Sequence, residues 1–192
     1  MNLMIFKRKV KLVDQVHLAL EEKVHAGDTV LDATVGNGKD TIKLADLVGD
    51  KGRVYGFDIQ NLAIEQTRLI LEKNNLLHRV KLFRSCHSIF DFHLSESIRG
   101  NLKAVVFNLG FLPGSDKDII TQKKSTLKAL NLSYQWLMQC GVLSILCYRG
   151  HHGGNEETDA IREMIENEKW SSREFEGVKS KNSPLLFIVV KH

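Results

Sequence analysis

The chain has 192 residues, of which 43% are hydrophobic and 26% are charged, a balance that suits one globular domain, residues 1–192, with a single buried core. No apolar run is long enough to cross a bilayer, and the three cysteines match neither a disulfide framework nor a zinc site. These features argue against a membrane-spanning chain, a disulfide-rich scaffold and a metal site. The N-terminal residues place apolar side chains before charges, the reverse of a secretory signal, so we expect a cytoplasmic protein.

The net charge of +4 is modest, but basic residues gather in three places along the chain. They cluster near residues 7–11, 123–124 and 179–181. Any single cluster is explained equally well by solvated side chains on an exposed face. The three together favour an anionic partner.

The chain is expected to begin with a helix and a buried strand. Apolar residues recur at helical spacing over about 11–25, and Gly27 ends the pattern. We expect this helix to cover one edge of the sheet. The first strand follows at 29–33.

Residues 30–41, Val-Leu-Asp-Ala-Thr-Val-Gly-Asn-Gly-Lys-Asp-Thr, are the stretch around which the chain is organised. Gly36 and Gly38 permit a tight turn, so that a ligand can meet bare backbone. The next helix is expected at about 40–47. A second strand, 53–58, ends in Asp58, a carboxylate able to accept both hydroxyl protons of a ribose. A glycine pair between apolar segments can also be an ordinary turn, but its pairing with Asp58 favours nucleotide binding.

The acidic residues of this turn indicate which nucleotide is bound. A dinucleotide site has a third glycine where this chain has Thr41, and it aims a helix N-terminus at pyrophosphate, which Asp32 and Asp40 would repel. A cationic ligand suits these acids, and S-adenosylmethionine carries a sulfonium and an ammonium group. Asp40 is also explained as a stabilising acid at a helix N-terminus. The expected contacts are Asp32, Thr34, Gly36, Asn37, Gly38, Asp40, Thr41, Asp58 and Gln60.

The next elements continue the alternation of helix and strand. A third helix is marked by Ala63, Thr67, Ile70 and Leu71, and a short strand follows at 80–83. The polar turn after this strand would pass beside adenine, where His87 or Ser88 can touch the base. A histidine in a turn is equally well explained as a surface residue.

Two long polar loops follow the central strands. Residues 102–108 are the clearest buried strand, and Asn108 lies where it leaves the sheet. The loop after Asn108 precedes a helix at about 125–138 and a strand at 141–148. A second loop at 149–155 contains His151. Because ligands lie at the carboxyl ends of parallel strands, both loops should line one crevice.

The remaining elements complete the expected architecture. A helix at 156–167 precedes strands at about 173–176 and 185–190, joined as a hairpin. We expect a single Rossmann-like α/β domain with a mostly parallel seven-stranded sheet, helices on both faces and an antiparallel C-terminal strand.

Four blocks of this sequence resemble the YtqB-like (MnmM) family of class I methyltransferases, formerly labelled rRNA methylases. The blocks are residues 32–41, 107–114 with Asp116-Lys117, 148–154 and 182–186. The resemblance covers nearly the whole chain. It implies S-adenosylmethionine as the cofactor and tRNA as the partner, with 5-aminomethyl-2-thiouridine at the wobble position of the anticodon loop as the acceptor. A homodimer is compatible with it. Phe111 departs from the tyrosine common in the family, which removes a hydroxyl from the expected acceptor site.

The residues and the resemblance together assign roles at the acceptor side. Asn108 is expected to position the acceptor amine, aided by the backbone carbonyls of Leu109 and Gly110, and His151 is expected to take its proton. Asn108 is alternatively a strand-ending turn residue, His151 a structural or phosphate contact, and water the proton acceptor. Phe111 and Tyr148 can stack on a base, although we expect at most one of them to do so. Lys117 is expected to contact the substrate.

Other functions remain open on the sequence. Ribosomal RNA or a small amine is an alternative acceptor, and a non-catalytic module that binds S-adenosylmethionine or RNA is an alternative of another class. A dehydrogenase fits poorly, because acids stand where pyrophosphate should lie.

Overall fold

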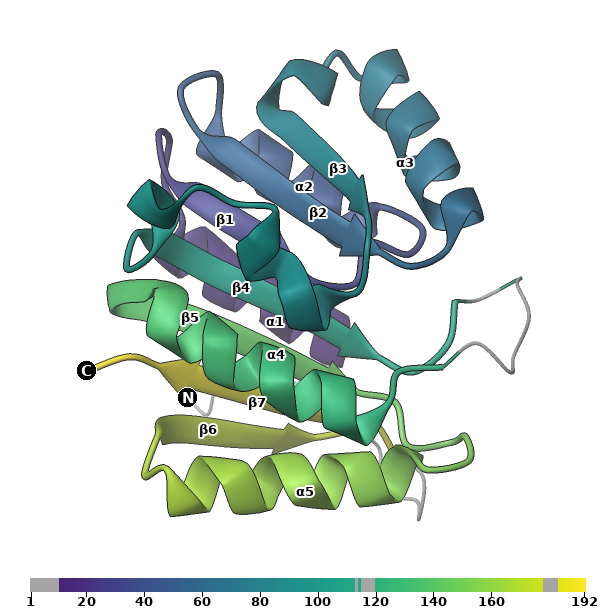
Figure 1. Ribbon diagram of the computed structural model, residues 1–192, viewed down its shortest axis with the longest axis vertical. Coiled ribbons are helices and arrows are strands. Elements are labelled where there is room, and N and C mark those ends of the chain that lie inside the picture. The colour runs from purple at the N-terminus through teal and green to yellow at the C-terminus, as the bar shows by residue number, and fades with distance from the viewer. Residues whose placement is uncertain (1–10, 113, 115–119, 178–182) are drawn as a thin grey trace, which may run out of the picture.

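A computed structural model describes residues 11–112, 114, 120–177 and 183–192. Its seven strands form one sheet in the order β3-β2-β1-β4-β5-β7-β6, seen obliquely in Figure 1. Strands β1 to β5 pair in parallel, and β7 pairs antiparallel with both β5 and β6. The expected mostly parallel sheet with an antiparallel C-terminal strand is confirmed.

The helices and strands alternate along the chain. The helices are α1 (Leu12–Lys23), α2 (Lys39–Val48), α3 (Asn61–Lys73), α4 (Lys123–Trp136) and α5 (Gly154–Asn167). The strands are β1 (Thr29–Asp32), β2 (Arg53–Asp58), β3 (Val80–Arg84), β4 (Leu102–Leu109), β5 (Leu137–Cys147), β6 (Ser171–Glu176) and β7 (Leu185–Val190). No helix in these described segments is long and apolar enough to span a membrane.

Two apolar clusters cover the two faces of the sheet. One joins α1, α2 and Leu71 of α3 to alternate strand residues such as Val30 and Val106. The other joins α4 and α5 to the opposite set, such as Leu31 and Phe107; Figure 1 shows α4 in front of the sheet. The central strands are therefore buried on both faces, which explains their nearly continuous apolar sequences.

Helix α1 does not cover an edge of the sheet, as the sequence led us to expect. It packs on β4, β5 and β7 and against α2, and these three strands are all interior. Its buried residues Leu12, Val16 and Leu20 recur at helical spacing, which identifies an apolar face but not the strands that this face covers. One end of α1 consequently reaches the carboxyl ends of the central strands.

The boundary between α4 and β5 also differs from the expectation. The helix was expected to extend to residue 138, but β5 begins at Leu137. Trp136 and Leu137 are 3% and 0% exposed, so the apolar run crosses from helix to strand without a change in hydrophobicity. A short apolar run of this kind does not distinguish the two by periodicity. Three short 3-10 segments, Leu77–Arg79, His87–Phe92 and Glu96–Ile98, were not predicted.

The glycine turn between β1 and α2 places two glycines in the left-handed region of backbone conformation. Gly36 and Gly38 have positive φ angles of 52° and 76°. A Cβ on Gly38 would lie 2.7 Å from Oγ1 of Thr67, whereas a Cβ on Gly36 would meet Leu112 at an ordinary 3.5 Å. Thr67 is fully buried and has little room to move.

We therefore expect Gly38→Ala to destabilise the chain more than the matched variant Gly36→Ala. Both add about 1–2 kcal/mol of left-handed backbone strain, and Gly38→Ala adds roughly 1–3 kcal/mol of overpacking against Thr67. Urea unfolding of the two variants measures the difference. Equal losses of unfolding free energy would contradict the turn geometry described here.

Candidate active site

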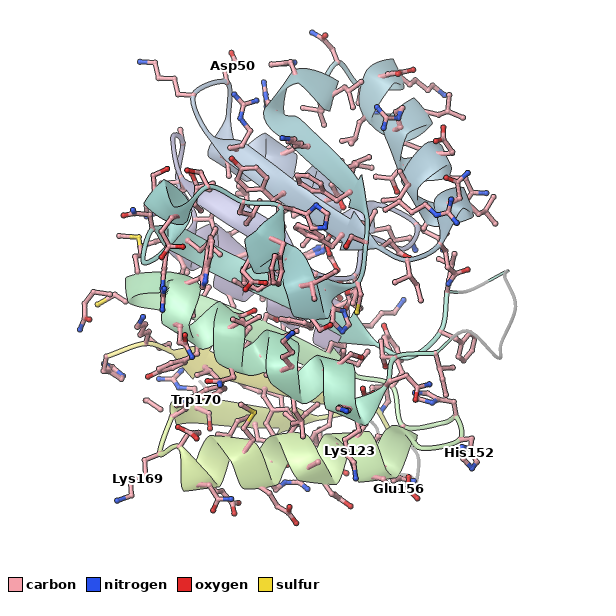
Figure 2. The ribbon with its side chains drawn as sticks, in the orientation of Figure 1. Asp50, Lys123, His152, Glu156, Lys169 and Trp170 are labelled. Atoms are coloured by element: carbon pink, nitrogen blue, oxygen red, sulfur yellow. The ribbon has the colours of Figure 1, made fainter. Side chains whose placement is uncertain are left out.

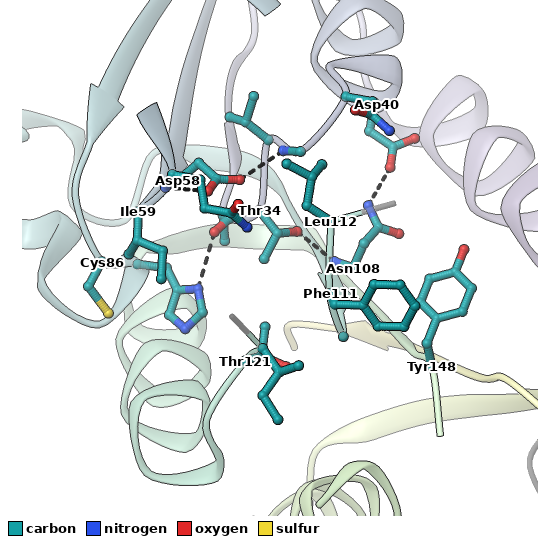
Figure 3. Close-up of a pocket in the computed structure, with 18 of the residues that line it drawn as sticks. Thr34, Asp40, Asp58, Ile59, Cys86, Asn108, Phe111, Leu112, Thr121 and Tyr148 are labelled. Atoms are coloured by element: carbon teal, nitrogen blue, oxygen red, sulfur yellow. Dashed lines mark hydrogen bonds between the residues drawn. The ribbon is translucent and has the colours of Figure 1, made fainter. Parts of the chain in front are cut away.

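A cavity of about 630 Å³ opens at the carboxyl ends of the parallel strands; Figure 3 shows it in close-up. Its walls come from the segments that follow β1, β2, β3, β4 and β5. The strand order reverses between β1 and β4, the place where open α/β sheets bind ligands. Its volume lies within the range of ordinary small-molecule sites. The predicted loop after Asn108 contributes Gly110, Phe111 and Leu112 to its lining, as the sequence indicated. The predicted loop at 149–155 contributes no lining residue, so the expectation that both loops line one crevice was wrong for it; Tyr148, at the end of the preceding predicted strand, lines the cavity instead.

Asp58 connects the end of β2 to the glycine turn. Its Oδ2 accepts the Gly36 N–H at 2.9 Å, and its Oδ1 accepts the Gln60 N–H at 2.9 Å. Burial raises the pKa of Asp58, while these backbone hydrogen bonds oppose the shift. Each carboxylate oxygen can accept a second hydrogen bond. Asp58 lines the cavity and so remains able to receive two ligand hydroxyls.

Asp32 lies behind the cavity wall and does not line it. Its side chain is 0% exposed, its Oδ2 accepts the Thr41 hydroxyl at 2.6 Å, and its Oδ1 accepts the Thr34 N–H at 3.1 Å. Burial, with a smaller contribution from nearby Asp40, raises the pKa of Asp32 to about 7. Asp32 and the buried Thr41 therefore brace the turn, and Asp32 can influence a ligand through its charge rather than by contact.

Asp40 and Asn108 meet across the gap between α2 and β4. The Asn108 Nδ2 donates to Asp40 Oδ2 at 2.5 Å, and the Asn108 N–H donates to Thr34 Oγ1 at 2.7 Å; both bonds are drawn in Figure 3. Because a carboxylate only accepts hydrogen bonds, the Asn108 amide turns its nitrogen toward Asp40. Its Oδ1 is then the atom available to a donor group in the cavity. Both side chains line the cavity, as predicted.

His87 belongs to the cavity wall, and its ring is largely buried. Its Nδ1 donates to the Ala33 carbonyl at 3.2 Å, so in the neutral ring Nε2 carries the lone pair. Within the described part of the chain, this buried Nε2 has no hydrogen-bond partner. Burial lowers the pKa of His87, which favours that neutral form. His87 is thus a buried residue of the cavity wall, not the surface residue of the alternative interpretation.

The aromatic residues Phe111 and Tyr148 lie at the mouth of the cavity, on the same side as Asn108 in Figure 3. They are 38% and 41% exposed, so neither belongs to the core. Burial raises the pKa of the Tyr148 phenol, and the nearby Asp40 carboxylate adds to the shift. Both rings are accessible to a flat acceptor, and stacking on a base stays a prediction.

His151 lies behind this wall rather than in the cavity. Its Nδ1 donates to the His152 carbonyl at 3.0 Å, and its ring meets Phe111 edge-on at 6.5 Å between centroids. A Cβ on Gly110 would lie 3.7 Å from its Nε2. This position suits support of the Gly110–Phe111 segment better than direct removal of a proton from a ligand.

The other predicted site residues divide into three groups. Thr34, Gly36, Asn37, Gln60 and Gly110 line the cavity. Gly38, Ser88 and Leu109 do not, and the Ser88 hydroxyl instead lies 3.2 Å from Cys86 Sγ. Lys117 lies outside the described residues.

Several cavity residues were not predicted from the sequence. Helix α1 contributes Val13, the segment before α4 contributes Ile120, Thr121 and Gln122, and the first turn of α4 contributes Ser125. The buried Glu157 of α5 holds this segment by accepting hydrogen bonds from the hydroxyls of Thr121 at 2.7 Å and Thr126 at 2.6 Å. The sequence showed that the loop was long and polar, but nothing in it indicated which residues return to the cavity.

Comparison with known proteins identifies relatives along most of the chain. A family model described as "Putative rRNA methylase" matches residues 54–191. The chloroplastic tRNA (mnm(5)s(2)U34)-methyltransferase of Arabidopsis thaliana is 36% identical over 97% of this chain and 71% of its own length.

Two solved structures are similar over nearly their full length. A crystal structure from Clostridium thermocellum, described in the same words as the family model, has 35% identity and a TM-score of 0.89 over 95% of this chain and 98% of its own. A "putative methyltransferase" from Streptococcus mutans, solved in complex with SAH, has 28% identity and a TM-score of 0.82 over 98% and 100%. The cavity described above therefore lies in a fold that these relatives share.

The raised pKa of Asp32 predicts how stability varies with pH. Between its ordinary value of 3.8 and about 7, the folded chain retains a proton that the unfolded chain has lost. The free energy of unfolding must therefore fall as pH rises through this window and level off above it. Asp32→Asn removes this contribution.

The stability of the wild type relative to Asp32→Asn should accordingly fall between pH 5 and pH 8, by an amount on the order of 1–4 kcal/mol at about 1.4 kcal/mol per pKa unit. Denaturant unfolding at several pH values measures it. Asp46→Asn, which removes an exposed carboxyl from the same helix as Asp40, controls for the loss of one charge. Parallel pH curves for the wild type and Asp32→Asn would refute the assigned burial of this carboxyl.

Proposed function

Because the chain belongs to the family described as "Putative rRNA methylase", we propose that it is an S-adenosylmethionine-dependent methyltransferase whose acceptor is the wobble uridine of tRNA. The confirmed family resemblance and the relative solved with SAH, the demethylated cofactor, support the cofactor. The relative named as a tRNA (mnm(5)s(2)U34)-methyltransferase supports the acceptor. The single observation that carries the proposal is the Asn108 amide, whose nitrogen is bonded to Asp40 so that its oxygen is the atom left for a donor group in an acid-lined cavity.

The residues of the cavity fit S-adenosylmethionine. Asp58 has lone pairs for the two ribose hydroxyls, and His87 lies in the part of the wall that would border adenine. Asp40 lines the cavity and Asp32 lies behind the same wall, so this wall attracts a cationic ligand. When bound, the cofactor supplies an electrophilic methyl group on a cationic sulfur.

The acceptor side of the cavity suits a primary amine on a base. Asn108 Oδ1 can accept an N–H of the amine and so orient its lone pair, and such positioning can supply several kcal/mol of the barrier reduction. The amine must first lose a proton. Since His151 lies behind Gly110 and both oxygens of Asp40 already accept hydrogen bonds, we assign this proton to water.

The surface around the cavity suits an RNA loop. Phe111 and Tyr148 offer exposed rings at its mouth, and stacking of a base on such a ring contributes about 1–3 kcal/mol. Lys123 and Lys124 are exposed at the start of α4. Figure 2 shows Lys123 and His152 at the end of the molecule where the parallel strands terminate.

A wobble base is already unpaired, so extruding it into the cavity costs less than flipping a base out of a duplex. We therefore propose the anticodon loop as the docking element.

Nucleoside mass analysis of tRNA tests this function. A strain lacking the protein should accumulate 5-aminomethyl-2-thiouridine, and the purified chain with S-adenosylmethionine should convert it to the 5-methylaminomethyl form. Unchanged nucleosides in both assays would refute the acceptor. Methylation of ribosomal RNA or of a small amine instead would replace it.

Asn108→Ala tests the role of the amide within that reaction. We expect kcat to fall by about 10²–10³-fold, the effect typical of removing one preorganised polar group, while calorimetry still detects binding of SAH. Asn101→Ala removes an exposed amide that donates to the Ser97 carbonyl of its own turn and should retain full activity. Normal turnover by Asn108→Ala would contradict the assignment.

A further inference from the structure

A histidine of α1 completes a hydrogen-bonded chain that ends at Asn108. His17 Nε2 lies 2.7 Å from Asp40 Oδ1, while Asp40 Oδ2 accepts the Asn108 amide. His17 lies one helical turn after Val13, which lines the cavity, so both residues lie on the same side of α1. The His17 and Asp40 side chains are 28% and 10% exposed, so the bond between them is largely shielded from solvent.

The direction of both hydrogen bonds follows from the carboxylate between them. A carboxylate only accepts, so His17 must carry hydrogen on Nε2 and Asn108 must turn its Nδ2 toward Asp40. Each oxygen of Asp40 therefore has its own donor, one from α1 and one from β4. Rotation of the carboxylate would break both bonds together, so the two donors hold its plane.

The orientation of the Asn108 amide depends on this arrangement. An asparagine amide has two orientations of nearly equal shape that exchange oxygen and nitrogen. Only the orientation with Nδ2 on Asp40 leaves Oδ1 to accept an N–H in the cavity. If Asp40 lost its partner on α1 and turned, the other orientation would place a donor where the acceptor amine needs an acceptor.

We propose that His17 is a positioning residue for methyl transfer: acting through Asp40, it fixes the Asn108 amide with Oδ1 toward the acceptor nitrogen. The proposal rests on the proposed function, because it names the acceptor amine as the group that Oδ1 receives. It assigns a role in the reaction to α1, whose residues precede the segment matched by the family model.

The alternative is that His17 merely fastens α1 to α2, and the chain offers a matched control for it. One turn further along α1, Glu21 pairs with Lys43 of α2, a second polar link between the same two helices. No hydrogen bond described in the structure connects that pair to Asn108. Breaking it should loosen the helix contact without affecting the amide.

The test compares His17→Met with His17→Gln, two variants of nearly equal size of which only glutamine can donate to Asp40. We expect His17→Met to lower kcat about tenfold, a cost near 1.4 kcal/mol, with KM for tRNA changed less than about twofold, since phosphate contacts supply much of nucleic-acid affinity. His17→Gln should recover most of the rate, and Glu21→Gln should match the wild type. If His17 acts through Asn108, His17→Met combined with Asn108→Ala should be no slower than Asn108→Ala alone.

A second readout does not depend on turnover. The side-chain amide signal of Asn108, identified in a nitrogen-15 NMR spectrum by its loss in Asn108→Ala, should shift in His17→Met and keep its wild-type position in His17→Gln and Glu21→Gln. Thermal unfolding verifies that each variant is folded, and His17→Phe replaces His17→Met if that variant does not fold.

These measurements distinguish failure of the positioning role of His17 from failure of the proposed tRNA acceptor. An Asn108 signal unchanged in the apolar variant, or shifted equally by Glu21→Gln, overturns the positioning role whatever the tRNA assay shows. A signal that shifts only in the apolar variant while the wild type fails to methylate tRNA upholds the coupling of His17 to Asn108 and refutes the proposed acceptor instead.

Discussion

The hydrogen bond from the Asn108 amide to the Asp40 carboxylate joins the two halves of the sheet at the switch point, where the strand order reverses between β1 and β4. Asp40 belongs to the helix after β1, and Asn108 is the residue before the last of β4, the strand on the other side of the switch point. The Asn108 N–H also donates to Thr34 in the glycine turn. The turn that would hold the cofactor and the amide that would hold the acceptor are therefore fixed relative to one another, as a transfer between two bound groups requires.

The acidic side chains around this contact repel one another. Asp32, Asp40 and Asp58 all lie at or behind one cavity, and burial, with added repulsion from Asp40 and Asp58, raises the pKa of Asp32 to about 7. Like charges this close are unfavourable until a cation is bound among them. A cationic cofactor relieves the repulsion, and its product, which lacks the sulfonium charge, relieves less of it. The same charges thus favour binding of the donor and release of the product.

The sequence predicted those features that local chemistry determines. The glycine turn, the carboxylate at the end of β2 and the polar residue where β4 leaves the sheet are each specified by a few neighbouring residues, and the structure brings Gly36, Asp58 and Asn108 into one cavity. The parallel sheet followed from the alternation of apolar strands and amphipathic helices. These inferences needed no knowledge of distant contacts.

The features that escaped prediction depend on tertiary packing. The apolar face of α1 gave no indication that the helix lies across the middle of the sheet, so His17 and Val13 were overlooked. Asp32 looks like a ligand contact in the sequence, but the Thr41 hydroxyl and the Thr34 N–H hold it behind the wall. His151 follows β5 as a cavity residue would, yet its ring turns behind Gly110. In each case the residue type suggested a role, but the sequence did not show in which direction the side chain points.

Calorimetric titration at pH 7, in two buffers of different ionisation enthalpy, tests most directly whether this acid-lined cavity selects a cationic methyl donor. S-adenosylmethionine should bind one per chain and release more protons than S-adenosylhomocysteine does, because the sulfonium favours the ionised form of Asp32, whose pKa lies near 7. Absence of binding, or equal proton release with the two ligands, would contradict the account.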